Sequence, residues 1–388
     1  MISNINDITF YLLIIPSIFR IIFPGSVDGK FTIFLNGMPF CLYDICLLLC
    51  LFISLLKNKL NSYCVYFFLC FETYILLQLI FRHYDDLLFA SLNDIYFLLP
   101  IVASVFALKI EIKEKYRYIF YFVEFYLFMQ VYLYSFGILT FRQTQNAETV
   151  YGIMRIGTTA GAATGTSVLV FLCYIITDFL EKNRMMKSLN FVLSFATVIV
   201  LQTKSVIVCY LVVLLYNILV YMKSGFFRKV LPVGIVSGMI VYVFSQNNIL
   251  RYIFARFTAE DLLSGRKSRY IAALSYFNDS PLFGYGIGNI YPIEILQENG
   301  YIVKNYVAVH NTYLLLLVEN GIIGVLLLFA VAVIGVSYFS VDWKKKKTIV
   351  CILLLFCVVF NTETIIINVE YIILICVVLR LVIREKQQ

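Results

Sequence analysis

Runs of apolar residues separated by short polar segments dominate this sequence. A helix needs roughly 20 apolar residues to cross a bilayer, and twelve of the runs are that long or nearly so. The pattern therefore predicts an all-α polytopic membrane protein with about twelve transmembrane helices. The predicted spans lie close to residues 8–24, 40–56, 63–81, 93–108, 118–139, 160–180, 188–201, 205–222, 230–246, 311–340, 348–361 and 365–383.

One segment interrupts this pattern. Residues 247–309 are hydrophilic and predict a large external loop between spans nine and ten. The chain thus divides into residues 1–246 with nine spans, the loop, and residues 310–388 with three spans and a cytoplasmic C-terminus. The loop holds two sets of mostly apolar residues at helical spacing, which predicts two amphipathic helices along the outer membrane surface. The first set is Leu250, Ile253, Phe254 and Phe257, and the second is Ile271, Leu274 and Ser275.

The run from 311 to 340 is longer than a single span requires. It is interrupted at Asn320-Gly321, and a glycine inside a long helix is a common cause of a kink. The sequence therefore predicts either a kink or a half-buried entry of the chain at this point.

Charge predicts the orientation of the chain. Six polar segments at alternating positions hold 19 of the 31 lysines and arginines, whereas the short loops between them hold five. Basic loops stay on the cytoplasmic side, so both termini are predicted to be cytoplasmic in a multi-pass protein of the inner (cytoplasmic) membrane. The basic segments are Lys57/Lys59, Lys109 to Arg117, Lys182 to Lys187, Lys223 to Lys229, Lys344 to Lys347 and Arg380 to Lys386.

Composition agrees with a membrane protein. Hydrophobic residues make up 61% of the 388 residues and charged residues only 14%, against about 25% in soluble domains. The net charge of +8 lies in short clusters between apolar runs, which indicates contact with membrane lipids and no nucleic-acid partner. All ten cysteines lie in apolar runs without metal-ligand spacing, so neither a metal nor a cofactor is expected.

Two histidines, His83 and His310, fall on the predicted outer side. His310 lies where the long loop re-enters the membrane, directly before Asn311. A histidine at such a boundary can accept a proton near neutral pH. The alternative is an interfacial histidine that only caps the helix.

Cations on the same predicted side could converge on a diphosphate. Guanidinium groups bind phosphate oxygens in pairs and offset the charge that develops on a leaving group. The alternative is that each is a solvated loop charge, although Lys204 lies in so short an outer turn that an unpartnered cation there is costly. The candidates are Arg155, Lys204, Arg256, Arg266 and Arg269.

Carboxylates within predicted spans keep a transporter in view, because intramembrane acids often mark ion or proton pathways. Glu319 lies nine residues after His310, well below the outer surface if that segment is helical. The two matching halves typical of transporters are not evident in the sequence. The embedded acids are Asp44, Glu72, Glu124, Asp178, Glu319 and Glu370.

Several motifs resemble those of the bacterial O-antigen polymerases and O-antigen ligases. The family's His-Asn, nine-residue gap and Gly-x-x-Gly signature is matched at His310-Asn311 and Gly321 to Gly324. The stretches Ser264-Gly265-Arg266 and Ser280 to Gly286 resemble the family's Ser-Gly-Arg and Pro-Leu-x-Gly-x-Gly segments. Thr203-Lys204-Ser205 resembles its Ser-Arg-Ser turn with Lys in place of Arg, and Tyr151 to Thr166 a degenerate Arg-x-x-Gly segment.

The resemblance, which spans roughly residues 150 to 340, implies a metal-independent glycosyltransferase. Its donors would be undecaprenyl-diphosphate-linked glycans at the outer leaflet, with a flippase and a chain-length regulator as further expected partners. The family's catalytic histidine corresponds to His310 and its essential cations to Arg266 and Lys204. Arg155, Arg256, Arg269, Asn311 and Glu319 are the expected substrate-binding residues. A polymerase of O-antigen or capsular polysaccharide is favoured, with an O-antigen ligase and a polysaccharide flippase as alternatives.

Overall fold

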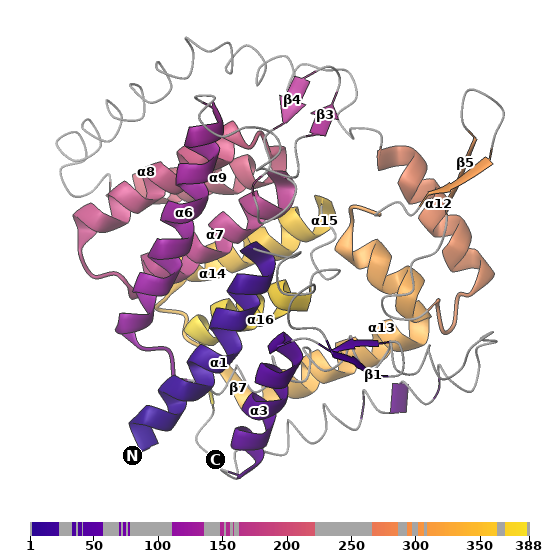
Figure 1. Ribbon diagram of the computed structural model, residues 1–388, viewed down its shortest axis with the longest axis horizontal. Helices are drawn as coiled ribbons and strands as arrows, with labels where there is room; N and C mark the ends of the chain where they lie inside the picture. The colour runs from indigo at the N-terminus through magenta and orange to yellow at the C-terminus, as the bar shows by residue number, and fades with distance from the viewer. Residues whose placement is uncertain are drawn as a thin grey trace.

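The computed structural model is a mostly helical assembly (Figure 1). The residues that it describes are 2–22, 33–35, 38–40, 42–56, 70, 73–74, 77, 111–135, 148–150, 153–155, 158, 163–221, 266–285, 293–296, 302–305, 309–362 and 369–385. The predicted spans at 93–108 and 230–246, most of the span at 63–81, and His83, Glu72 and Arg256 lie outside them.

Each remaining predicted span corresponds to a helix. For most of these spans the predicted and observed ends agree within a few residues. Nine of the predicted segments coincide with helices in the part of the chain that the structure describes. These helices are α1 (Ile2–Ile22), α3 (Leu42–Leu56), α6 (Arg117–Ser135), α7 (Ala163–Leu180), α8 (Arg184–Val200), α9 (Lys204–Tyr221), α13 (Thr312–Tyr338), α14 (Lys346–Leu354) with its continuations, and α16 (Val369–Val382). The continuations are a π-helical segment (Leu355–Val359) and α15 (Phe360–Thr362), and a 3-10 turn (Glu114–Tyr116) precedes α6.

Short strands qualify the expectation of an all-α fold. In the described ranges four antiparallel pairs occur outside the helices, where backbone groups must find partners of their own. Apolar periodicity does not reveal such three- or four-residue pairs. They are β1 (Ile33–Leu35) with β2 (Met38–Phe40), β3 (Glu148–Val150) with β4 (Ile153–Arg155), β5 (Ile293–Leu296) with β6 (Ile302–Asn305), and β7 (Phe339–Val341) with β8 (Ile383–Glu385).

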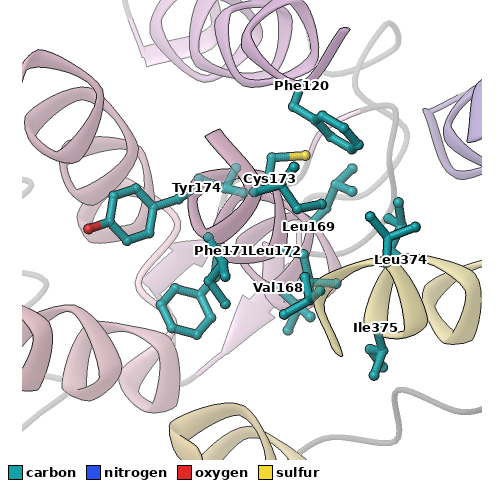
Figure 2. Packing of buried hydrophobic residues seen from close by; sticks show 14 of the residues in the cluster. Phe120, Val168, Leu169, Phe171, Leu172, Cys173, Tyr174, Leu374 and Ile375 are labelled. Atoms are coloured by element: carbon teal, nitrogen blue, oxygen red, sulfur yellow. The ribbon is translucent and has the colours of Figure 1, made fainter. Parts of the chain in front are cut away.

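Helix α7 is the centre of the main core. Nearly all of its residues are buried, and a helix that is apolar on every side must be enclosed by other helices. Figure 2 shows α7 side chains from Val168 to Tyr174 packed near Phe120 of α6 and near Leu374 and Ile375 of α16. Helices α8, α9 and α14 also contact α7.

Two helices in the described ranges are long and apolar enough to cross a membrane. One is α7, and the other is the segment Thr312–Ala330 at the start of α13. Shorter apolar helices lie within α1, α9 and α16. The number of spans therefore remains a prediction for much of the chain.

Four of the predicted cytoplasmic segments meet at one end of the molecule. We call residues 111–117, 181–187, 342–347 and 380–385 the basic end. Lys113 Nζ lies 2.7 Å from the carboxylate of Asp7 in α1, which Lys115 and Tyr116 also contact. Arg117 Nε lies 3.4 Å from Glu181 Oε2, and the backbone N–H of Asp342 donates to the carbonyl of Val382. The alternation of basic loops along the chain requires that these segments lie on one side of the molecule. That this side faces the cytoplasm stays a prediction.

Hydrogen bonds at the basic end hold two carboxylates in the ionised form. Bonds from Lys113, Lys115 and Tyr116 lower the pKa of Asp7. The backbone N–H of Asn183 lowers the pKa of Glu181, helped by the N–H of Lys182 and the charge of Arg117. Several cations of the basic end are therefore held by ionised carboxylates.

The ion pair between Lys347 and Asp178 should contribute more to stability than an exposed ion pair does. Its Nζ–Oδ1 distance is 2.6 Å, and the two side chains are only 25% and 11% exposed. Replacing Lys347 with methionine leaves Asp178 partly buried without its cation, so we expect a loss of about 2 kcal/mol in thermal unfolding of the purified protein. Lys182→Met is the control, because its pair with Glu114 is 77% and 53% exposed and such pairs contribute under about 1 kcal/mol. Equal losses in the two variants would contradict a structural role for the Lys347–Asp178 pair.

Candidate functional site

Several of the predicted site residues lie at the end of the molecule opposite the basic end. We call residues 163–167, 202–204, 309–313 and 360–362 the site end. Tyr371 Oη donates to the carbonyl of Gly165, 2.9 Å away, which ties the start of α16 to the start of α7. Because α16 begins seven residues after Thr362, at most about 25 Å separates the end of α15 from the start of α16.

His310 lies in a tight turn that leads into α13. Its φ is 54°, in the left-handed region, which histidine enters more readily than most residues. Val309 before it is buried, and the Asn311 side chain after it accepts the N–H of Leu314 at 2.9 Å. Asn311 thereby caps α13, a structural role beside its predicted role in substrate binding.

Helix α12 (Arg266–Asp279), which carries two of the predicted cations, contacts this turn. Tyr270 Oη of α12 donates to the carbonyl of His310, 3.2 Å away. Arg266 begins α12 and lies one turn before Tyr270, and residues four apart share a helix face. The structure therefore brings the helix that carries Arg266 and Arg269 to His310, as Figure 1 shows for α12 and α13.

The apolar residues that predicted a helix along the membrane surface are not the residues of α12 that pack against α13. Ile271 and Leu274 are 59% and 47% exposed, whereas Ala273 is buried against α13. Ala273 shares a small core with Val309, Leu315 and Val318. The small alanine allows the two helices to approach closely. The spacing of apolar residues alone does not reveal such a contact. The helix itself was predicted correctly, and the first amphipathic segment, at 250–257, lies outside the described residues.

The predicted kink in α13 is present at Gly321, whose φ is 61° and ψ is −172°. The break leaves backbone groups near it without partners inside the helix. The segment 280–285 supplies them: Ile322 N–H donates to Pro281 O at 2.9 Å, and Ile323 N–H to Leu282 O at 3.1 Å. In return Tyr285 N–H donates to Val318 O, which would otherwise accept from Ile322.

Glycines allow this close docking. A Cβ on Gly321 would lie 2.3 Å from Leu282 O, and one on Gly284 would lie 2.5 Å from Glu319 O. A Cβ on Gly324 would lie 2.7 Å from the ring of Tyr74. The Gly-x-x-Gly signature and the Pro-Leu-x-Gly stretch are thus two halves of one contact, with buried Glu319 at its edge.

Lys204 begins α9 in the tight turn after α8, where Gln202 has a φ of 56°. Buried hydroxyls fix this turn to α7: Ser167 Oγ donates to Thr203 Oγ1 at 2.8 Å, and Thr203 Oγ1 donates to the Ala163 carbonyl at 3.3 Å. The hydroxyls of Thr158 and Thr166 form a hydrogen bond with each other nearby. The sequence analysis missed these hydroxyls, although a run rich in Thr, Gly and Ala from 158 to 167 was a visible signal.

Arg155 lies in the pair β3–β4, where it stands opposite Glu148. Eight residues separate it from the start of α7, so it is near the site end in sequence, but only its backbone placement is described. Arg256 lies outside the described residues. In the described ranges no three His, Cys, Asp or Glu side chains gather in a way that could hold a metal ion.

Two of the predicted intramembrane acids have structural partners. Asp178 pairs with Lys347. Glu124, which is 7% exposed, contacts Thr177 at 3.3 Å and Asn190 at 3.4 Å. These contacts join α6, α7, α8 and α14, so the acids are accounted for by helix packing without an ion pathway.

Comparison with known protein families supports the predicted resemblance. Residues 189–329 match the family model described as O-antigen ligase. The match covers less than half of the chain, and it includes Lys204, Arg266, His310 and Gly321 to Gly324 while leaving out Arg155. A search of curated proteins finds no match to this chain.

Proposed function

We propose that this chain, which carries an O-antigen ligase family domain at residues 189–329, is a polysaccharide polymerase of the cytoplasmic membrane. It would join undecaprenyl-diphosphate-linked repeat units at the outer leaflet. The observation that carries the proposal is the hydrogen bond between Tyr270 of α12 and the His310 turn, because it puts a helix with two arginines beside the candidate base.

The proposed reaction needs a base and a cation on opposite sides of one bond. His310 accepts the proton of an acceptor hydroxyl, and the freed oxygen bonds to the anomeric carbon of the donor glycan. The bond between that carbon and the diphosphate oxygen breaks, and the carrier leaves with the electron pair. Arg266 and Arg269 on α12 would stabilise this charge as it develops.

Lys204 is proposed to hold the diphosphate from the α9 side. Its ammonium is a point charge and cannot form the paired contact of a guanidinium. The buried hydroxyls of Ser167 and Thr203 hold the backbone before Lys204 in place. This fixes the point from which the lysine side chain extends and compensates in part for the missing paired contact. Arg155 and Arg256 remain proposed contacts to the substrate, as do Asn311 and Glu319.

An O-antigen ligase is the nearest alternative, since only the acceptor would change from a lipid-linked repeat to a lipid core. The family description names a ligase, and the motifs in this chain resemble those of polymerases and ligases alike. A flippase is less well supported, because Asp178 and Glu124 have structural partners in the described residues.

Analysis of lipid-linked glycans after deletion of the gene tests the proposal. We expect single repeat units to accumulate on the outer leaflet, as measured by mass spectrometry of carrier-linked glycans, and wild-type polymer to return with a plasmid copy. Long polymers that stay on the carrier would replace the polymerase assignment with a ligase. Repeat units trapped on the inner leaflet would contradict a transferase and favour a flippase.

A further inference from the structure

The hydroxyl of Tyr270 lies between two backbone carbonyls from different elements. It is 3.2 Å from the carbonyl of His310 and 3.4 Å from that of Asn361 in α15. A phenol has one proton, so it donates to either carbonyl or is shared between both. Either way, the Tyr270 side chain of α12 links the His310 turn to α15.

A second tyrosine secures the same end of α13. Tyr313 Oη donates to the carbonyl of Phe356 at 2.8 Å, and its ring lies 6.0 Å from that of Phe360. Phe356 belongs to the π-helical segment, where the bonding pattern shifts by one residue, and such segments are frequent at functional sites. Tyr313 therefore fixes the first turn of α13, and Tyr270 fixes the residue that carries the imidazole.

The conformation of His310 gives this anchor a purpose. A non-glycine residue at positive φ costs of order 1–3 kcal/mol and persists only where its surroundings impose it. Three contacts impose it here: buried Val309 before it, the Asn311 cap after it and the Tyr270 bond to its own carbonyl. Val309 packs in one small core with Ala273 of α12, and the Tyr270 bond is the hydrogen bond that joins this helix directly to the His310 backbone.

We propose that Tyr270 is a positioning residue, which holds the backbone of His310 in register with Arg266 on α12. This inference rests on the proposed function, in which His310 and Arg266 act on opposite sides of the bond that breaks. Tyr270 does not contact the substrate. Its hydroxyl sets the distance between base and cation, and a misplaced base lowers the rate without weakening donor binding.

The test compares Tyr270→Phe with Tyr276→Phe in the full-length protein in lipid nanodiscs. Both variants keep their rings: position 270 stays in the small core with Ala273, and the ring of Tyr276 stays 5.5 Å from that of Tyr285. We expect Tyr270→Phe to lower kcat about tenfold with an unchanged KM for the lipid-linked donor, since one hydrogen bond is typically worth that factor or less. Tyr276→Phe should retain the wild-type kcat. Replacing Tyr270 with 3-fluorotyrosine, which keeps the hydroxyl, should also retain it.

Hydrogen exchange supplies a readout that does not depend on activity. In Tyr270→Phe the amides of residues 309–313 should exchange about tenfold faster, while amides of α7 keep their protection. Wild-type kcat together with wild-type exchange in Tyr270→Phe would overturn the inference. Faster exchange in Tyr270→Phe combined with full activity when His310 is replaced would sustain the anchor and refute the proposed function, so the two failures are distinguishable.

Discussion

Replacing Gly321 with alanine is expected to abolish polymer formation and to leave little folded protein in the membrane. The added Cβ would lie 2.3 Å from Leu282 O and 2.6 Å from Gly284 N, both of them backbone atoms that cannot rotate away. The φ of 61° and ψ of −172° also belong to a region that is essentially restricted to glycine. Alanine must therefore either expel the segment 280–285 or rebuild the break.

The expected cost is large because several interactions fail together. Expelling the segment leaves the N–H groups of Ile322 and Ile323 and the carbonyl of Val318 without their present partners. Unsatisfied backbone groups in a nonpolar setting cost about 1–3 kcal/mol each, so a loss of more than about 4 kcal/mol is expected. Thermal unfolding in detergent, followed by size-exclusion chromatography, measures it.

Gly165→Ala is the matched control for this substitution. Gly165 also lies in a helix at the site end, but a Cβ there would meet only Tyr371 Oη, at 3.5 Å, an ordinary contact. Unfolding temperature and polymer yield should stay near the wild-type values. If Gly321→Ala behaved like Gly165→Ala, the docking of segment 280–285 against α13 would not be what holds the two motifs together.

Local sequence pattern was sufficient to predict much of the helical framework. The predicted spans at 118–139 and 188–201 became Arg117–Ser135 and Arg184–Val200, because the length of an apolar run is a local property. The break at Gly321 was predictable for a similar reason, since a glycine beside an asparagine weakens a helix wherever the helix packs. Charge alternation anticipated the gathering at the basic end.

Contacts between distant segments were not predictable from the same pattern. Nothing local shows that Pro281 and Leu282 supply acceptors for Ile322 and Ile323, some forty residues later. The contact between α12 and α13 at Ala273 was not predictable either, because helix packing depends on close approach as well as on apolar area. For the site, sequence motifs named His310 and Arg266, whereas the tyrosine that joins their elements carried no motif.

Replacing His310 with asparagine is expected to lower the rate of glycosyl transfer by about 10²–10⁴-fold while the protein stays folded. Asparagine tolerates positive φ, so the turn before α13 can keep its φ of 54°, but its amide cannot accept a proton at neutral pH. Loss of a general base typically costs that factor. Polymer formed from purified lipid-linked repeats in nanodiscs measures the rate, and hydrogen exchange of α13 checks the fold.

A second variant separates a base from a residue that only shapes the turn. His310→Gly also accepts positive φ without strain, and it leaves space where the imidazole ring stood. If that ring accepts the acceptor's proton, imidazole added to the buffer should restore part of the rate in His310→Gly but none in His310→Asn, where the side chain fills the space. If His310 serves only to turn the chain into α13, both variants should work near the wild-type rate, and added imidazole should change neither. In that case the cations of α12 would act on the diphosphate without a base from this turn, and the base would have to come from another residue.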